Sequence, residues 1–422
     1  MHKTTDRIES KIEPCSVNSI RRIMAAILAA ALLASALVSS ASCLRPVSVE
    51  RRGYVVAIGM DEGSEKEYEI TFELQRESTG EARDGGGSVI LSCEARDIFD
   101  AVSELSSNTA YDLNFTRTHL FIVGEKLARE GKLKDILNMS FDVLRIRKSA
   151  LMVVARCSVR DYIGGLASNN NANIAKMQDA LISNVETTGE SAAINLALFL
   201  EAVDGGRFDA AAPMGDYDEK LITDAKQRSE AEKGENPIAD AQKGSRIGGM
   251  QGFTRGCALF DGETMRGELS PAETQFMNLV RGDYKRGTIA YPLENGETAS
   301  LLVFPNKRRI SVEINGGAPH ARMTLHLNMT VERDPSKLIG ENWESGEREK
   351  LEAFFEETMK RVFEKCRECS SDAMGFGRYA SMNFKSVEEW EAFCWKSAYG
   401  ALTAEFDVVL NLDDEYLVRI GG

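Results

Sequence analysis

The stretch that decides the fold is DIFDAVSELSSNTAYDLNFTRTHLFIVGEKLAREG, residues 97–131. Apolar residues at helical spacing predict an amphipathic helix over residues 95–107. The short apolar run HLFIVG at 119–124 is typical of a buried strand, and residues 125–144 predict a helix interrupted near Gly131. The apolar run ALMVVA at 150–155 predicts a central strand. Strands and helices are therefore expected to alternate around one sheet.

Two more strands are expected upstream of this stretch. EYEITFELQ at 67–75 places every second residue, from Tyr68 to Leu74, on one apolar face, which is the period of a half-buried strand. GYVVAIG at 53–59 predicts its partner strand, and residues 60–63 predict the turn between them.

The second half of the chain shows a different pattern. RMTLHLNMTVE at 322–332 alternates without error, and NGGAPH at 315–320 predicts a hairpin that joins it to a strand at 309–314. Ser270, Pro271 and Glu273 predict a capped helix start. The remaining expected elements are a strand at 299–304, a long helix at 347–369, a helix that carries Trp390, Phe393 and Trp395, and a last strand at 404–412. This half is expected to be α+β with an antiparallel sheet.

Length and charge limit the possible functions. The chain has 422 residues, enough for two to three domains, and a net charge of −14. Such an acidic chain is a poor candidate for a nucleic-acid binder, because that affinity comes largely from Lys and Arg. Large apolar residues nearly vanish at 223–249, which predicts a polar linker or long surface loop.

The N-terminus predicts export. Residues 23–38 are uncharged and apolar, Arg21 and Arg22 precede them, and small residues follow up to Cys43. This is the layout of a secretory signal, and 16 residues are short for a membrane-spanning helix, which needs about 20. A Cys directly after the cleavage site is the bacterial lipoprotein arrangement, so Cys43 is the expected lipid-attachment residue. An uncleaved N-terminal anchor and a plain secreted protein are the alternatives.

The charge of the mature chain bears on how it meets a membrane. Removal of residues 1–42, which hold five Lys/Arg and three Asp/Glu, changes the net charge from −14 to −16. An acidic body is repelled by an anionic lipid surface. The body is therefore expected to stand off on its tether or to dock on another protein.

No catalytic or metal-binding pattern stands out. Cys366 and Cys369 form the one CxxC, but they lie near the C-terminal end of the predicted helix and lack two further zinc ligands, so they are interpreted as a core cysteine and its neighbour. Cys93, Cys157, Cys257 and Cys394 are interpreted as buried free thiols within predicted elements, although export would permit a disulfide. His119, His320 and His326 are not at metal-ligand spacing. No enzyme activity, cofactor or metal is expected.

Four segments, in order along the chain, resemble the Ger(x)C family, the lipoprotein C subunits of nutrient germinant receptors in endospore-forming bacteria. They are the signal with Cys43 followed by GYVVAIGMDEG (53–63) and EITFEL, then residues 97–131, then GCALFDGETMRGELSPAET (256–274), and finally GFGR (375–378) with Trp390, Trp395 and EFDVVLNL. The chain departs from the family in Leu44-Arg45-Pro46 after the cysteine and in Ser40 of the cleavage box.

The resemblance implies about three mixed α/β domains on the outer face of the spore's inner membrane. It implies assembly with polytopic membrane subunits and a role in responding to small nutrients, and it does not imply catalysis. Cys43 is the one functional residue that it transfers. The expected organisation is a signal peptide at 1–42, an N-terminal germination-protein region at 43–222, the linker at 223–249 and a C-terminal germination-protein region at 250–422. A split of the last region near 300 into two subdomains is the alternative.

The predicted function is that of a membrane-tethered, non-enzymatic receptor subunit in spore germination, in a multidomain chain of mixed α/β or α+β class. The alternative is a free-standing extracytoplasmic lipoprotein, either a solute-binding protein or an envelope hydrolase. Whether the subunit binds small molecules directly is left open.

Overall fold

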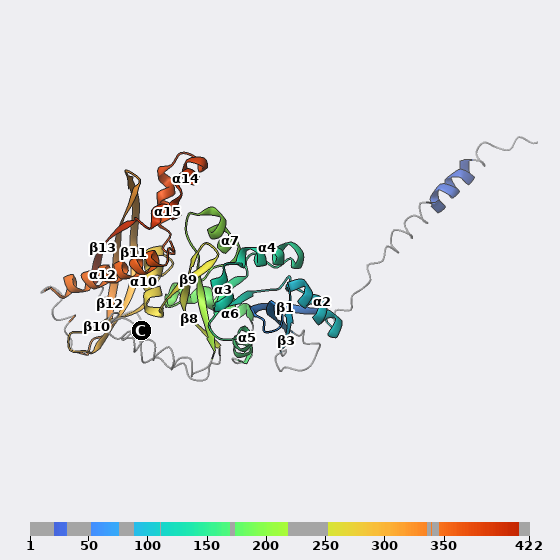
Figure 1. The fold of residues 1–422 in the computed structure, drawn as a ribbon, viewed down its shortest axis with the longest axis horizontal. Coiled ribbons are helices and arrows are strands. Elements are labelled where there is room, and N and C mark those ends of the chain that lie inside the picture. Colours follow the sequence, from blue (N-terminus) through green and yellow to red (C-terminus); the bar gives the residue numbers. More distant parts are fainter. Residues whose placement is uncertain are drawn as a thin grey trace, which may run out of the picture. The chain divides into compact units, whose positions relative to one another are not determined.

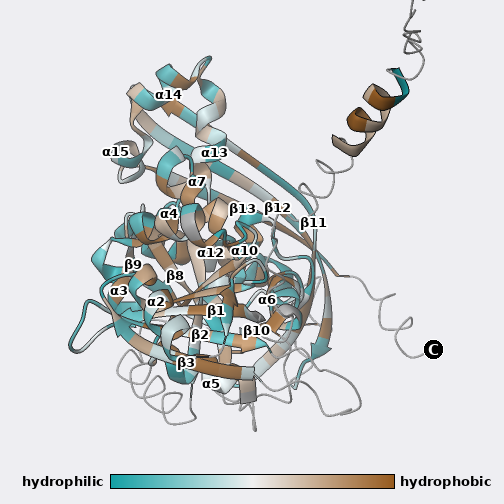
Figure 2. Cartoon of the chain, turned by 90° about the vertical axis from the view of Figure 1, so that its right-hand side faces the viewer, coloured by the Kyte–Doolittle hydropathy of each residue, from teal (hydrophilic) through white to brown (hydrophobic). Residues whose placement is uncertain are grey.

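The computed structural model describes residues 21–31, 52–75, 88–109, 111–168, 174–217, 252–335, 339 and 346–412. The chain divides into two units, residues 1–50 and 51–422. In the first unit, residues 21–31 form an exposed helix that is mostly hydrophobic (Figure 2). Within the described ranges, every helix is too short or too polar to cross a membrane.

The first sheet of the second unit has nine strands (Figure 1). Its order is β3-β2-β1-β5-β6-β7-β8-β9, with β4 paired to β1. Strands β1, β5, β6 and β7 are parallel to one another. On one side of them, β2 pairs antiparallel with β1 and β3 pairs antiparallel with β2. On the other side, β8 pairs antiparallel with β7 and β9 pairs antiparallel with β8. The strands are β1 (Arg52–Glu62), β2 (Tyr68–Gln75), β3 (Ser88–Ala95), β4 (Asp112–Asn114), β5 (Leu120–Gly124), β6 (Leu151–Ala155), β7 (Ala211–Tyr217), β8 (Gly252–Asp261) and β9 (Thr264–Leu269).

Helices cover both faces of this sheet. One face packs on α2 (Ile98–Asn108), α3 (Glu125–Glu130), α4 (Leu133–Leu144) and α7 (Leu196–Gly205). The other face packs on α5 (Val159–Ser168) and α6 (Ile174–Thr187). The expected strands at 53–59, 67–75, 119–124 and 150–155 are confirmed, as is the helix break at Gly131, where φ is +75°.

The second sheet has the order β10-β11-β12-β13. Its strands are β10 (Gly287–Pro292), β11 (Thr298–Asn315), β12 (Ala318–Arg333) and β13 (Thr403–Leu412). The helices of this part are α10 (Pro271–Arg281), α12 (Glu347–Glu368), α13 (Phe376–Ala380), the 3₁₀ turn η3 (Ser381–Asn383), α14 (Val387–Phe393) and α15 (Trp395–Tyr399). The predicted start of α10 is confirmed, because Ser270 and Glu273 form a capping box.

Three expectations for this half are wrong. The sheet is mixed, because β13 runs parallel to β12 after helices α12 to α15 carry the chain back. The two strands expected at 299–304 and 309–314 form the single strand β11, with an irregular register between Pro305 and Lys307. The helix expected to carry both Trp390 and Trp395 is broken at Cys394, where φ is 52°.

The first sheet crosses from one half of the chain to the other. β7 pairs with β8, so that Ala211 lies opposite Leu259 and Tyr217 lies opposite Gly252. The border predicted near residue 250 thus falls within a continuous sheet, and the linker predicted at 223–249 lies outside the described residues. The mixed α/β, multidomain fold class is confirmed.

Candidate functional site

A crevice of about 470 Å³ opens at the carboxyl ends of β1, β5 and β6. After β5 the chain enters α3 on one face of the sheet, and after β6 it enters α5 on the opposite face. Such a switch point is where open α/β sheets commonly bind ligands. The crevice is lined by Asp61, Glu62, Glu125, Lys126, Arg129, Ala155, Arg156, Cys157 and Ser158.

The charged groups of the crevice form ion pairs and hydrogen bonds with neighbouring groups. Arg129 pairs with Glu125 at 2.7 Å, and Arg156 pairs with Glu268 at 2.8 Å. Asp61 accepts a 3.2 Å hydrogen bond from the backbone N–H of Val159, so it fixes the start of α5. These contacts connect the residues that line the crevice to one another and to β9.

The thiol in the crevice is a weak nucleophile. Burial, with the charge of Asp216 as a smaller cause, raises the pKa of Cys157 to about 12. The reactive species of a cysteine is the thiolate, which is scarce at neutral pH when the pKa is this high. Cys157 is thus poorly placed for covalent chemistry.

A second feature is a buried carboxylate, Asp372, just after α12. Its side chain accepts hydrogen bonds from three successive backbone N–H groups, those of Gly375 at 3.0 Å, Phe376 at 2.9 Å and Gly377 at 2.7 Å. The indole Nε1–H of Trp395 donates a fourth bond at 2.9 Å. Burial raises the pKa of Asp372 to about 7, although these donors lower it.

Asp209, just before β7, connects this carboxylate to the first sheet. Its Oδ2 accepts from the backbone N–H of Asp372 at 2.9 Å, and its Oδ1 accepts from the backbone N–H of Gly262 at 3.0 Å. Burial raises the pKa of Asp209 as well. We call this set, Asp209, Gly262, Asp372, residues 375–377 and Trp395, the carboxylate junction.

Two segments of the chain match known protein domains. Residues 46–217 match the domain described as "Spore germination protein N-terminal domain", and residues 255–415 match "Spore germination B3/ GerAC like, C-terminal". The chain belongs to the GerAC-like family of spore germination proteins. Membership gives it the role of a germinant receptor C subunit in spore germination.

One solved structure resembles this GerAC-like chain. It is described as the crystal structure of the GerBC protein, with 13% sequence identity and a TM-score of 0.48, and the match covers 87% of this chain and 100% of that one. No curated protein matches the chain.

The carboxylate junction joins the two matched regions of the GerAC-like chain. Asp209 lies in the N-terminal match, whereas Gly262 and Asp372 lie in the C-terminal match. The GFGR sequence at 375–378 forms the turn around the Asp372 carboxylate. A Cβ on Gly377 would lie 2.5 Å from Nε1 of Trp395 and 2.6 Å from the backbone oxygen of Arg207, so the turn requires glycine there.

The sequence-predicted residues are widely separated. Cys43 lies outside the described residues. Cys366 is buried and Cys369 half-buried at the end of α12, both as free thiols with pKa values raised by burial. The expectation of a buried thiol is wrong for Cys394, which is exposed. His119 contacts Gln178 and Arg147, whereas His320 lies beside Thr403. Within the described part of the chain, no group of three or more His, Cys, Asp or Glu is placed to hold a metal ion.

Neither the crevice nor the carboxylate junction was predicted from the sequence. Asp372 lies only three residues before the GFGR turn, so that motif was an available signal for the junction. The crevice had no comparable signal, because its residues come from three separate strand ends.

Proposed function

We propose that this GerAC-like chain is a membrane-tethered, non-enzymatic subunit of a nutrient germinant receptor, held on the extracytoplasmic face of the membrane by a lipid on Cys43. The observation that carries the proposal is the pair of family matches, which together cover more than three quarters of the chain directly after an export signal that ends in cysteine. A diacylated cysteine anchors stably, because two acyl chains hold where one holds only marginally.

The non-enzymatic role is supported by the chemistry of the described sites. Each carboxylate that lines the crevice has a partner within the protein: Glu125 pairs with Arg129, Glu62 pairs with Lys126, and Asp61 accepts from the backbone at the start of α5. The thiols of Cys157, Cys257 and Cys366 have pKa values raised by burial. These groups are suited to holding the fold and to polar recognition.

The anchor is tested by mass spectrometry of the mature N-terminus, together with labelling by radioactive palmitate in a spore-forming host. We expect label on the wild type and on Cys394→Ser, a control at an exposed cysteine, and none on Cys43→Ser. Label that persists in Cys43→Ser would contradict the lipid site. Retention of residues 23–38 would replace the lipid by a transmembrane tether.

The partners are tested by affinity purification of the full chain from detergent-solubilised spore membranes. We expect polytopic membrane subunits to copurify, and we expect deletion of the gene to abolish a nutrient response when no redundant receptor is present. Copurification with a transport permease, together with unchanged germination, would instead favour the alternative of a free-standing solute-binding lipoprotein.

A further inference from the structure

The amino-terminal edge of the first sheet, where β1, β5 and β6 begin, carries a concentration of positive charge. The basic residues there come from the loop before β5, the loop before β6 and the first turn of α6, and they are Arg117, Arg145, Arg147, Lys148 and Lys176. The acidic residues of the same edge are Asp112, Asp142 and Asp179. All of these side chains are exposed except Arg147, which is half-buried. We call this set the basic edge.

Specific contacts hold the basic edge together. The guanidinium of Arg117 lies 3.9 Å above the ring of Tyr54 in β1. Nη2 of Arg147 lies 2.8 Å from Nδ1 of His119, which joins the two loops. Gln178 donates to the backbone oxygen of Ser149 at 2.8 Å, and this bond fixes the start of α6 beside the loop before β6. The cations therefore share one surface.

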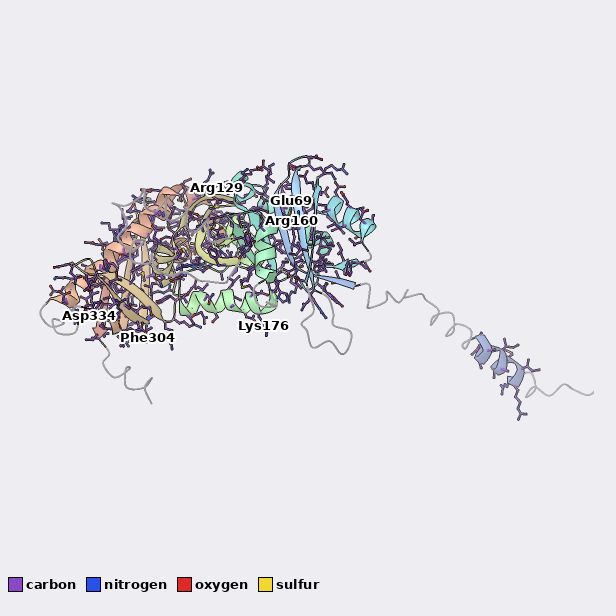
Figure 3. All side chains as sticks on the ribbon, turned by 90° about the horizontal axis from the view of Figure 1, so that it is seen from below. Glu69, Arg129, Arg160, Lys176, Phe304 and Asp334 are labelled. Carbon is purple, nitrogen blue, oxygen red and sulfur yellow. The ribbon has the colours of Figure 1, made fainter. Side chains whose placement is uncertain are left out.

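At the opposite edge of the sheet, two arginines form ion pairs. At the crevice, the cations of Arg129 and Arg156 are paired with carboxylates at 2.7–2.8 Å. Lys148 and Lys176 of the basic edge have no ion-pair partner among the described residues. Figure 3 shows Arg129 and Lys176 at opposite ends of this part of the molecule. Lys148 and Lys176 therefore leave two exposed cations of the basic edge without a carboxylate partner among the described residues.

The chain enters the sheet at this same edge. β1 begins at Arg52, and Cys43 precedes it by 52 − 43 = 9 residues. At ~3.5 Å per residue, this segment spans at most about 30 Å. An anchor on Cys43 therefore keeps the basic edge close to the membrane surface.

An apolar side chain adjoins the cations. Leu198 of α7 is 39% exposed, and the backbone N–H of its neighbour Ala197 donates to the backbone oxygen of Lys148 at 3.0 Å. Exposed apolar groups beside basic residues suit the boundary between lipid headgroups and acyl chains.

We propose that the basic edge docks on anionic phospholipid headgroups and so fixes the orientation of the protein on its membrane. This inference rests on the membrane tether of the proposed function. The net charge of −16 does not oppose it, because at physiological salt a charge is screened beyond about 8 Å and the nearest charges decide the contact. Headgroup phosphates are recognised by the exposed Lys and Arg side chains, and the acidic body projects away from the surface.

The test is hydrogen exchange of the full chain reconstituted through its own N-terminus into vesicles of phosphatidylcholine, with or without phosphatidylglycerol. We expect severalfold slower exchange in peptides covering 116–119 and 145–149 on the anionic vesicles, and we expect raised salt to remove the difference. Equal exchange on both kinds of vesicle would overturn the proposal.

A pair of double variants separates local charge from net charge. Lys148→Glu with Lys176→Glu should abolish the slowing, whereas Lys360→Glu with Lys385→Glu, which changes net charge equally at exposed positions elsewhere, should retain it. Loss of slowing in both variants would also overturn the proposal. The mass of the N-terminus is read separately, so failure of the lipid anchor and failure of docking remain distinguishable.

Discussion

The carboxyl of Asp372 should make the protein less stable as the pH rises, and Asp372→Asn should remove that dependence. The side chain is fully buried, and burial raises its pKa from 3.8 to about 7, with the nearby charge of Asp209 as a smaller cause. Because the folded state holds this proton more tightly than the unfolded state, the group contributes stability below pH 3.8. That contribution is lost as the pH rises through about 7.

The size of the effect follows from the two pKa values. They differ by about three, and each unit corresponds to about 1.4 kcal/mol, so ionisation of Asp372 costs about 4 kcal/mol of unfolding free energy. Asparagine does not titrate. We therefore compare the unfolding free energies of the wild type and Asp372→Asn. The difference, wild type minus variant, should fall by about 4 kcal/mol between about pH 4 and about pH 8.

The assay is urea unfolding of both proteins, followed by circular dichroism, across this pH range. Glu94→Gln is a control of opposite sign, because hydrogen bonds from Ser64 and from the backbone of residues 64–66 lower the pKa of Glu94 to about 2. The advantage of the wild type over that variant should shrink as the pH falls below 4.5. A difference between wild type and Asp372→Asn that does not change with pH would refute the reasoning.

Two substitutions and one labelling experiment test further features of the structure. Gly377→Ala should lower stability by about 1–3 kcal/mol in thermal unfolding, because its Cβ would lie 2.5 Å from the indole nitrogen, whereas Gly400→Ala, with no atom within 4 Å, should be nearly neutral. Glu356→Ala should speed amide exchange of Val408 at the edge of β13, because Glu356 accepts that N–H at 2.9 Å, and exposed Glu357→Ala should leave it unchanged. A maleimide should label exposed Cys394 before the other described cysteines, because hydrogen bonding to Ser397 lowers its pKa, and peptide mapping would reveal any other order.

Local patterns predicted the elements whose periodicity matches their burial. β12 alternates between buried and more exposed residues, and the Ser270 capping box sets the start of α10. The sequence of β2 alternates too, but the expectation of a half-buried strand is wrong, because Thr71 and Glu73 on its polar face are also buried. β7 was missed because AAPMGDY contains Pro, Gly and Asp, which disfavour strands. Its burial between β6 and β8 outweighs that preference. The direction of β13 was mispredicted, because strand direction depends on how the intervening helices return the chain.

The candidate sites depend on contacts that are distant in sequence. Asp209 and Asp372 are 163 positions apart, and no spacing rule relates two carboxylates at such a separation. The crevice likewise requires knowledge of which strands are neighbours. The motif GFGR indicated the family but not its physical role, which is to turn the backbone around a buried charge.

The pairing of β7 with β8 has a consequence for how the polypeptide can be divided. These strands are joined by backbone hydrogen bonds from Ala211 to Tyr217, whatever the path of residues 218–251. A protease cut in that segment should leave two fragments that migrate as one particle. The N-terminal fragment produced alone would present β7 as a bare edge, which is a template for aggregation. The two halves should therefore be recoverable as separate polypeptides only when the same cell synthesises both.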